Sequence, residues 1–552
     1  MTGGKSLISK VRIVNFKCIN GVFDLELNNG LNVIVGNNNE GKSTVLEAIH
    51  LALTGIFRGK LLRNNLTQYL FNNEIIAEYL AKLKEDTTVE LPKILIELYL
   101  HDLNPELEGD LFSDKNYESR TSGIGLEVAF DEKYRNEYNE LISSEDINSL
   151  PIEYYDVNWY SFSRKPLTTR SVPIKSSFID VGFSKFWNGN DIYISRIIHD
   201  LLETGEKVAV AQAFRSAKDN FSNDKSISNI NEKLTGISKL SKKEIELTVD
   251  LSAKASWDGS LITLVDKVPF DFIGKGEQAI IKTELALSNK KAEASSVIII
   301  EEPESHISHS RLNQLLQDIK QNYGDKQILI STHSSFVANK LGLDNLILLN
   351  QLKTIRFDDL KSKEFFEKIA GYDTLRLILC NKAILVEGDS DELIIQRAYM
   401  DKNQGRLPIE DNVEVISVGT SFLRFLEIAE KLDIPVSVVT DNDGDIEAVE
   451  KKYSNYINKN KKENIEIYYD KNVERGNLKI GNSNKPFNYN TLEPILLEYN
   501  SLDLFNGIFG KDCKNEEEMH IYMKNNKTGC ALKIFSSNEK ITYPNYILEA
   551  IE

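Results

Sequence analysis

Cysteine is scarce in this chain of 552 residues, which contains only four. Cys18, Cys380, Cys513 and Cys530 form no C-x-x-C pair. The sequence therefore offers neither a zinc ribbon nor a framework of disulfides. Isolated thiols of this kind are typical of proteins in a reducing compartment, so we expect a cytoplasmic protein.

Long hydrophobic runs are absent as well. No stretch approaches the roughly 18 apolar residues that a membrane span needs, and the N-terminal "MTGGKSLISKVRIVNF" lacks the apolar core of a signal peptide. No heptad pattern is sustained over three repeats, which argues against a long coiled coil. With 41% hydrophobic and 27% charged residues, the composition predicts a soluble globular protein of about two to four domains with no membrane partner.

Positive charge is in deficit, because 66 Lys and Arg face 83 Asp and Glu, for a net charge of −17. This balance argues against nucleic acid as a partner, but local patches count for more than totals. Residues 451–485 hold nine Lys or Arg against four acids. Four tyrosines are interleaved with these charges: Tyr453, Tyr456, Tyr468 and Tyr469. The patch is either a solvated loop or a contact for a phosphate backbone.

The strongest motif in the chain is "GNNNEGKS" (Gly36–Ser43), which follows a short β-branched strand and fits G-x-x-x-x-G-K-[ST]. A periodic helix begins at about Lys42. In such a loop the backbone N–H groups cradle phosphates, the lysine reaches the β and γ oxygens, and the serine holds Mg²⁺. The loop therefore predicts ATP-binding residues: Gly36, Asn37, Asn38, Gly41, Lys42, Ser43 and Thr44.

The partners of this loop come about 260 residues later. "SSVIIIEEPESH" is a buried strand ending in two acids, which is the Walker B arrangement: Glu301 is predicted to face Mg²⁺ and Glu302 to polarise the attacking water. "KQILISTHSSFVAN" is a second buried strand, and its end places His333 where an imidazole contacts the γ-phosphate. Two further histidines are assigned a structural role, His306 and His309.

"FDFIGKGEQAIIKTELAL" places Gly274 and Gly276 before an amphipathic helix that begins near Glu277. Glycine-rich helix starts bind phosphate through bare N–H groups. Because it stands just before the Walker B strand, this segment resembles the signature motif of ABC-type ATPases. In that family the signature loop of one subunit closes over the nucleotide of the other, so the resemblance implies a homodimer or a higher homo-oligomer.

The order of motifs resembles the SMC and RecF-like branch of these ATPases. "ISKVRIVNFKCING" looks like their opening strand pair, and residues 93–100 and 153–163 are expected in the ATPase sheet. A polar, helix-prone stretch from about Asp191 is the expected inserted, mainly helical dimerisation segment. Gln68 is a candidate metal-contacting glutamine.

The second half restarts an α/β pattern without a second P-loop. In "ILVEGDSDELII" a strand ends in Glu387, with Asp391 and Glu392 close behind, and in "IPVSVVTDNDGD" another strand ends in Asp441 and Asp443. Strands that alternate with helices imply a parallel sheet with ligands at the carboxyl ends. Alone, the first cluster could be an acidic helix start and the second an Asx turn. Together they predict an oxygen-rich site for Mg²⁺ or Mn²⁺.

This arrangement resembles the Toprim domain of topoisomerases, primases and nucleases, whose acids bind one or two Mg²⁺ ions that act on phosphodiesters. An ABC-type ATPase followed by a Toprim domain resembles the OLD (overcoming lysogenization defect) family of ATP-dependent endonucleases, in its Gabija A-like form. The resemblance implies a further metal ligand, Glu493 in "NTLEPILL", and a lysine on the scissile phosphate, Lys527 in "NKTGCALKIF". It gives Glu387 a catalytic role. Whether Asp391 or Glu392 is the ligand stays open.

The sequence thus predicts an α/β chain. Residues 1–190 and 261–365 are expected to form an ABC-type ATPase domain, residues 191–260 its helical insert, and residues 366–552 a Rossmann-like Toprim domain. The expected function is an ATP-regulated, divalent-metal-dependent endonuclease acting on double-stranded DNA. The resemblance implies bacterial anti-phage defence with a second defence protein encoded nearby. The alternative is an ATP-switched DNA-binding clamp or sensor whose Toprim domain is a non-catalytic docking scaffold.

Overall fold

The computed structural model describes residues 7–57, 60–84, 89–101, 104–116, 120–144, 147–169, 171–180, 202–235, 263–287, 295–324, 326–357, 359–368, 374–479 and 486–552. The chain divides into two compact units. The first comprises Met1–His333 with Leu349–Thr354, and the second comprises Ser334–Leu348 with Ile355–Glu552.

The second unit begins earlier than the predicted boundary at residue 365, because it includes α10 (Ser335–Leu341). This helix contacts α12 (Thr374–Leu379). A buried hydrogen bond of 2.6 Å joins Thr374 Oγ1 to Asn339 Oδ1. Sequence patterns could not show this long-range contact.

The P-loop strand belongs to a sheet with the order β10-β13-β14-β3-β15-β16. Its strands are β3 (Leu31–Val35), β10 (Ser176–Asp180), β13 (Val297–Glu301), β14 (Gln327–Ser331), β15 (Leu346–Asn350) and β16 (Lys353–Arg356). β10, β13, β14 and β3 run parallel to one another. Continuous runs of buried Val, Ile and Leu, as in β13, suit a parallel sheet covered on both faces. The strand ends that carry the ATP motifs therefore meet at one edge.

A second, antiparallel sheet lies in the first unit, with the order β2-β1-β6-β8-β7 and with β9 paired to β8. Its strands are β1 (Ile8–Val14), β2 (Val22–Glu26), β6 (Ile94–Leu100), β7 (Glu108–Gly109), β8 (Thr121–Phe130) and β9 (Tyr155–Ser161). The expected opening strand pair is β1 and β2. The segments 93–100 and 153–163 supply β6 and β9, so they belong to this sheet and not to the P-loop sheet, because β6 pairs with β1 and β9 with β8.

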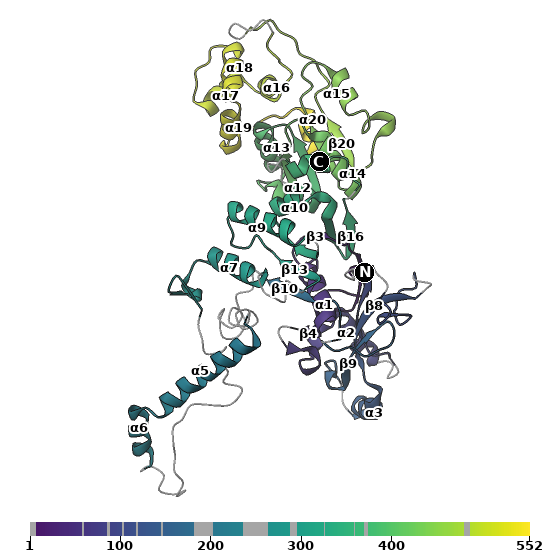
Figure 1. Ribbon diagram of the computed structural model, residues 1–552. Helices are drawn as coiled ribbons and strands as arrows, with labels where there is room; N and C mark the ends of the chain where they lie inside the picture. Colours follow the sequence, from purple (N-terminus) through teal and green to yellow (C-terminus); the bar gives the residue numbers. More distant parts are fainter. Residues whose placement is uncertain are drawn as a thin grey trace. The chain divides into compact units, whose positions relative to one another are not determined.

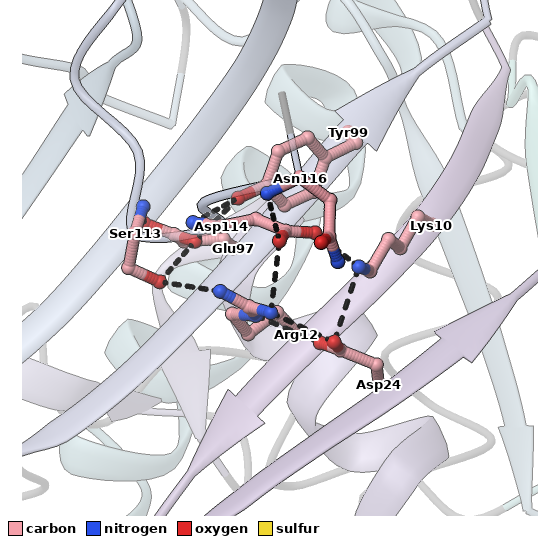
Figure 2. A network of polar contacts seen from close by, with 8 residues as sticks. All are labelled: Lys10, Arg12, Asp24, Glu97, Tyr99, Ser113, Asp114 and Asn116. Carbon is pink, nitrogen blue, oxygen red and sulfur yellow. Dashed lines mark hydrogen bonds and ion pairs between the residues drawn. The ribbon is translucent and has the colours of Figure 1, made fainter. Parts of the chain in front are cut away.

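A buried network of charges joins β1, β2 and the segment after β7 (Figure 2). The Arg12 guanidinium donates two hydrogen bonds of 2.8 Å to the Asp24 carboxylate and lies 3.2 Å from Asp114. Lys10 bridges the same two acids. Because each buried charge has an opposite charge beside it, the network fixes these strands without leaving an uncompensated ion.

The remaining elements of this unit are short strands and helices around the sheets. The strands are β4 (Ile56–Phe57), β5 (Lys60–Leu61), β11 (Leu264–Val265) and β12 (Val268–Pro269). The helices are α1 (Lys42–Thr54), α2 (Asn73–Leu83), α3 (Arg135–Ser144), α5 (Thr204–Ser222), α6 (Lys225–Thr235), α7 (Lys275–Leu287) and α9 (His309–Asn322). α5 and α6 lie inside the predicted insert 191–260 and are helical as expected (Figure 1). Residues 191–201 and 236–260 of that prediction lie outside the described residues.

The second unit contains a parallel sheet with the order β18-β17-β19-β20. Its strands are β17 (Lys382–Val386), β18 (Val413–Ser417), β19 (Val436–Val439) and β20 (Ile465–Tyr468). From β17 the chain builds one neighbour, β18, and then crosses to the other side to build β19. This is a topological switch point, where ligands bind in open α/β sheets. It sets the ends of the two acid-bearing strands, β17 and β19, side by side.

Helices surround this sheet: α11 (Lys363–Lys368), α13 (Asp389–Lys402), α14 (Phe422–Leu432), α15 (Ile446–Lys452), α16 (Leu492–Tyr499), α17 (Leu502–Phe509), α18 (Glu516–Asn525), α19 (Lys527–Ser536) and α20 (Asn545–Ala550). α16 to α19 gather in one helical cluster (Figure 1). Met519 and Ile534 of this cluster share a core with Ile394 of α13. The buried Arg397 of α13 donates to the carbonyls of Ile534 (2.9 Å) and Phe535 (3.1 Å) at the end of α19. This contact holds α19, and hence Lys527 at its start, against α13.

All four cysteines are free thiols, and Cys380 and Cys530 are buried. Across the described residues, no helix is both long enough and apolar enough to cross a membrane.

Candidate functional site

The P-loop opens directly into α1. Gly41 precedes the helix with φ of 95°, a left-handed conformation that glycine adopts without strain, and no side chain caps the helix start. The buried Lys42 Nζ donates to the carbonyls of Gly36 and Asn37, each at 2.9 Å. The first N–H groups of α1 are therefore available to an anion, which is how helix starts bind phosphate.

The other predicted loop residues flank this helix start. Asn37 and Asn38 are exposed. Thr44 is buried and accepts a weak hydrogen bond from the Cys18 thiol at 3.3 Å. Gly36 packs so closely that a Cβ would lie 2.4 Å from the Leu349 carbonyl oxygen, so this position excludes any larger residue.

Ser43 and Glu301, the two predicted ligands of the ATP-bound metal, are in direct contact. The Ser43 hydroxyl donates to the Glu301 carboxylate across 258 residues of sequence. A hydroxyl and a carboxylate at the phosphate-binding loop are the donors that Mg²⁺ takes beside a nucleotide. Burial lowers the pKa of Lys42, although Glu302 and Glu40 oppose this shift.

The predicted base Glu302 lies at the turn after β13, with φ of 44°. Its carboxylate accepts a hydrogen bond of 3.2 Å from Ser305 and lies 3.6 Å from His333 Nε2. Burial lowers the pKa of His333, and the charge of Lys42 lowers it further against the opposing effect of Glu302. A neutral imidazole therefore stands beside the carboxylate that would orient water.

Glu304 belongs to this site, although no role was predicted for it. One of its oxygens, Oε1, accepts from Thr332 Oγ1 at 2.7 Å and from the backbone N–H of His333 at 2.9 Å. The other, Oε2, is buried without a hydrogen-bond partner among the described residues. Glu304 thus positions His333. The sequence could have nominated Glu304 for this site, because it is the third acid in "EEPE".

The signature segment has both exposed and packed positions. Gly274 and Glu277 are exposed at the start of α7, so their predicted contact with a nucleotide remains a prediction. Gly276 has a packing reason of its own, because a Cβ there would lie 2.6 Å from the His306 carbonyl oxygen. The buried Gln278 ties the segment to the helix by donating to the Phe270 carbonyl at 3.0 Å.

Three further groups of predicted residues are a glutamine, two histidines and the tyrosines of the basic patch. Gln68 Oε1 accepts a hydrogen bond of 3.1 Å from the Leu150 N–H, which gives this glutamine a structural contact. His306 and His309 are both exposed. In the basic patch, Tyr453 and Tyr456 are buried, so these two rings are core residues and not a stacking surface. Lys485 lies outside the described residues.

Four carboxylates lie near enough at the switch point of the second unit to act on one another electrostatically. Glu387 follows β17, Asp441 follows β19, Asp391 lies in the first turn of α13 and Glu493 in the first turn of α16. Burial raises the pKa of Asp391 to about 6, and the charges of Glu493 and Glu387 add to the shift. The pKa of Asp441 is raised well above its usual value by burial and then by Asp391, Glu387 and Glu493. These four carboxylates, hereafter the acid cluster, repel one another unless a cation lies between them.

Asp391 and Glu392, which the sequence could not tell apart, have different surroundings. Asp391 Oδ2 accepts the Gly388 N–H at 3.1 Å and faces the acid cluster. Glu392 accepts from Gln396 at 3.2 Å and lies 3.9 Å from Arg376. Burial raises the pKa of Glu392, Arg376 opposes the shift, and the acids named among its main causes are Asp389 and Glu414, neither of which belongs to the acid cluster. Successive helical residues point about 100° apart, so only Asp391 joins the cluster.

Asp443 and Lys527 flank the acid cluster. Asp443 has φ of 49° and accepts a hydrogen bond of 2.8 Å from Asn488. Lys527 Nζ lies 3.1 Å from the Glu493 carboxylate, whose side chain is 7% exposed. Burial lowers the pKa of Lys527, but Glu493 and Asp441 outweigh burial and raise it overall. The lysine is therefore a firm cation at the edge of the cluster.

Tyr546, near the C-terminus of the chain, was not predicted for this site. Burial raises its pKa well above the usual value, and the charges of Asp441 and Asp391 contribute. The side chain comes from α20, which contacts β19 and β20. No local motif marks the residue, since its place depends on where α20 packs.

The donors of the acid cluster suit a hard cation. Among the residues that the structure describes, no three or more His, Cys, Asp or Glu side chains are gathered closely enough to hold a metal ion. A divalent cation would supply the positive charge that such carboxylates need in order to approach one another. Because every donor is a carboxylate oxygen, the set fits Mg²⁺ or Mn²⁺ and does not fit zinc.

Comparison with known families covers both units. Residues 7–338, more than half of the chain, match the family described as AAA ATPase domain. The chain belongs to this ATPase family. Residues 378–443 match the family described as the Toprim domain of overcoming lysogenization defect (OLD) protein-like proteins. The predicted union of an ATPase with an OLD-like Toprim domain is thereby confirmed, whereas the Gabija A-like subtype stays a prediction.

Individual relatives are more distant. The DNA replication and repair protein RecF of Clostridium tetani is 31% identical over 84 residues, which are 15% of this chain and 23% of that protein. The SMC head domain from Thermotoga maritima is 12% identical with a TM-score of 0.28, covering 63% of this chain and 98% of its own. A RecF structure from the RecFOR pathway is 12% identical with a TM-score of 0.32, covering 64% and 98%. At such scores these structures carry no functional argument.

Proposed function

We propose that the chain is an ATP-regulated endonuclease that cleaves double-stranded DNA and depends on a divalent metal. The observation that carries this proposal is the acid cluster beside Lys527 at the switch point of the second unit. Carboxylates that repel one another destabilise a fold unless a ligand uses them, and of these four Glu493 is buried whereas Glu387 is exposed. The OLD-like Toprim match over residues 378–443, which include Glu387, Asp391 and Asp441 but neither Glu493 nor Lys527, supports the same function.

At a phosphodiester the carboxylates would bind metal, and the lysine would bind the phosphate. When bound, divalent cations supply charge stabilisation for an in-line displacement at phosphorus. Glu387, Asp391, Asp441 and Glu493 would hold them, with Asp443 at the rim. Lys527, which Glu493 fixes in place, would donate to the scissile phosphate and stabilise the charge that develops there.

The first unit would act as the switch. Lys42 and the start of α1 would bind the phosphates of ATP, Ser43 and Glu301 would hold its Mg²⁺, and Glu302 would orient water. We propose that bound ATP pairs two ATPase units through the exposed signature segment at α7, with the insert around α5 and α6 as the dimerisation element. Service in anti-phage defence with a second defence protein rests on the resemblance to OLD-like, Gabija A-like proteins alone.

The test is nicking of supercoiled plasmid DNA with Mg²⁺ or Mn²⁺. The wild-type protein is expected to produce open-circular or linear DNA, and an Asp441→Ala/Asp443→Ala double variant is expected to cut at least about 100-fold more slowly, because it loses metal ligands. Equal cutting by the double variant would refute the nuclease. If the wild type bound DNA only in the presence of ATP and failed to cut it with every divalent ion, the clamp or sensor would be the correct function.

A further inference from the structure

A cavity of about 220 Å³ adjoins the acid cluster on the side of α15. Glu387 and Asp441 line it, and Lys452 and Tyr453 at the end of α15 line it as well. Neither Lys527 nor Glu493 lines this cavity. It therefore lies beside the metal-binding carboxylates but apart from the lysine predicted to contact the scissile phosphate.

The hydroxyl of Tyr453 is the first unusual feature of this cavity. The residue is 0% exposed, and its Oη has no hydrogen-bond partner among the described residues. The Thr440 side chain lies beside the phenol oxygen and acts on it as a hydrogen-bond donor would, and its Oγ1 is also 3.5 Å from the Asp441 backbone carbonyl. Neither contact gives the phenol O–H an acceptor. A buried hydroxyl without a partner is costly, and an unmet donor that lines a cavity points to a ligand.

The ammonium group of Lys452 is the second. It lies 4.9 Å from the ring centre of Phe422 and 5.1 Å from that of Tyr453. These two rings pack edge to face, 6.3 Å apart, and hold the lysine stem over the cavity. Within the described residues Lys452 forms no ion pair, although four carboxylates line the same cavity: Glu387, Asp441, Asp443 and Asp445. A cation held by rings, and not by these acids, remains available to an anion.

We propose that Lys452 and Tyr453 bind a backbone phosphate of the DNA strand next to the phosphate that is cut. The inference rests on the proposed nuclease function and deepens it. Divalent cations in the acid cluster would offset the surrounding carboxylates, and the ammonium and phenol groups would then donate to the phosphate oxygens. The strand would be held at two points, by Lys527 at the scissile phosphate and by Lys452 and Tyr453 at a neighbour.

The experiment measures binding without cleavage. A short blunt-ended DNA duplex is titrated with the full chain in Ca²⁺ at a series of salt concentrations. Each phosphate contact contributes about 0.9 to the slope of log K against log salt. Lys452→Met is expected to lower that slope by about 0.9, Lys452→Arg to retain it, and Lys402→Met, at the far end of α13 from Asp391, to leave it unchanged. Equal slopes for Lys452→Met and wild type, or equal losses for both methionine variants, would overturn the proposal.

Tyr453→Phe tests the hydroxyl separately and keeps the buried ring. It is expected to weaken duplex binding about 5- to 30-fold without changing the slope, because a neutral donor is lost. If this variant bound the duplex with wild-type affinity, Tyr453 would not be part of the phosphate site, and its hydroxyl would hydrogen-bond only to water. Because neither assay needs cleavage, a wild type that never cuts would refute the nuclease while the slopes still decided the phosphate site.

Discussion

Asp391→Asn is expected to slow DNA cleavage by at least about 100-fold, whereas Glu392→Gln is expected to stay within about threefold of wild type. The first change removes a carboxylate from the acid cluster, where charge is needed to hold a divalent cation. Glu392→Gln only weakens the ion pair with Arg376, which is 3.9 Å long. Partly exposed ion pairs of this kind contribute little to the stability of a protein. Initial rates of plasmid nicking in Mg²⁺ measure both variants.

Thermal unfolding supplies the control for this pair. Asn at position 391 can still accept the Gly388 N–H, which is now bonded to Asp391 Oδ2 at 3.1 Å. It also removes a buried charge that its neighbours repel. Asp391→Asn is therefore expected to melt at or above the wild-type temperature when no divalent ion is present. Full nicking by Asp391→Asn with loss in Glu392→Gln would reverse the assignment of the ligand.

Glu302→Gln is expected to lower kcat for ATP hydrolysis by about 10²- to 10⁴-fold, the usual contribution of a general base. The affinity for ATP is expected to change little, because Lys42 and the start of α1 make the phosphate contacts. Phosphate release under saturating ATP measures the rate, and binding of a fluorescent ATP analogue measures the affinity.

Glu304→Gln is the matched comparison for this variant. Its amide oxygen can still accept from Thr332 and His333, as Glu304 does now. We expect its rate to fall by no more than about tenfold, since the residue acts through its hydrogen bonds to Thr332 and His333. If Glu302→Gln hydrolysed ATP at the wild-type rate, another residue would have to be the base.

The sequence alone was enough to nominate those residues of both candidate sites that stand at the ends of single strands. Lys42, Glu301 and His333 each follow a buried strand, and parallel strands bring such ends to one edge. The same rule brought Glu387 and Asp441 together. In each case the sequence shows that the residue stands at a strand end, and the parallel sheet determines where that end lies.

What the sequence missed depends on packing between distant elements. Asp391 and Glu392 share a helical turn, and only the rotation of α13 against β17 and β19 separates them. Tyr546 joins the acid cluster through the packing of α20, and Tyr453 becomes a core residue because α15 turns it inward. β6 and β9 were expected in the ATPase sheet, and the sequence could not tell which of two sheets they would join, since a buried apolar run looks the same in either one.

We propose that two cation sites in separate units divide ATP chemistry from DNA chemistry. Counting bound Mn²⁺ by the loss of its free-ion paramagnetic resonance signal tests it most directly. Without nucleotide, the wild type is expected to bind Mn²⁺ and Asp441→Ala/Asp443→Ala to lose that binding, whereas Ser43→Ala keeps it. A non-hydrolysable ATP analogue is expected to add one ion in the double variant and none in Ser43→Ala. Unchanged Mn²⁺ binding by the double variant without nucleotide would contradict the account.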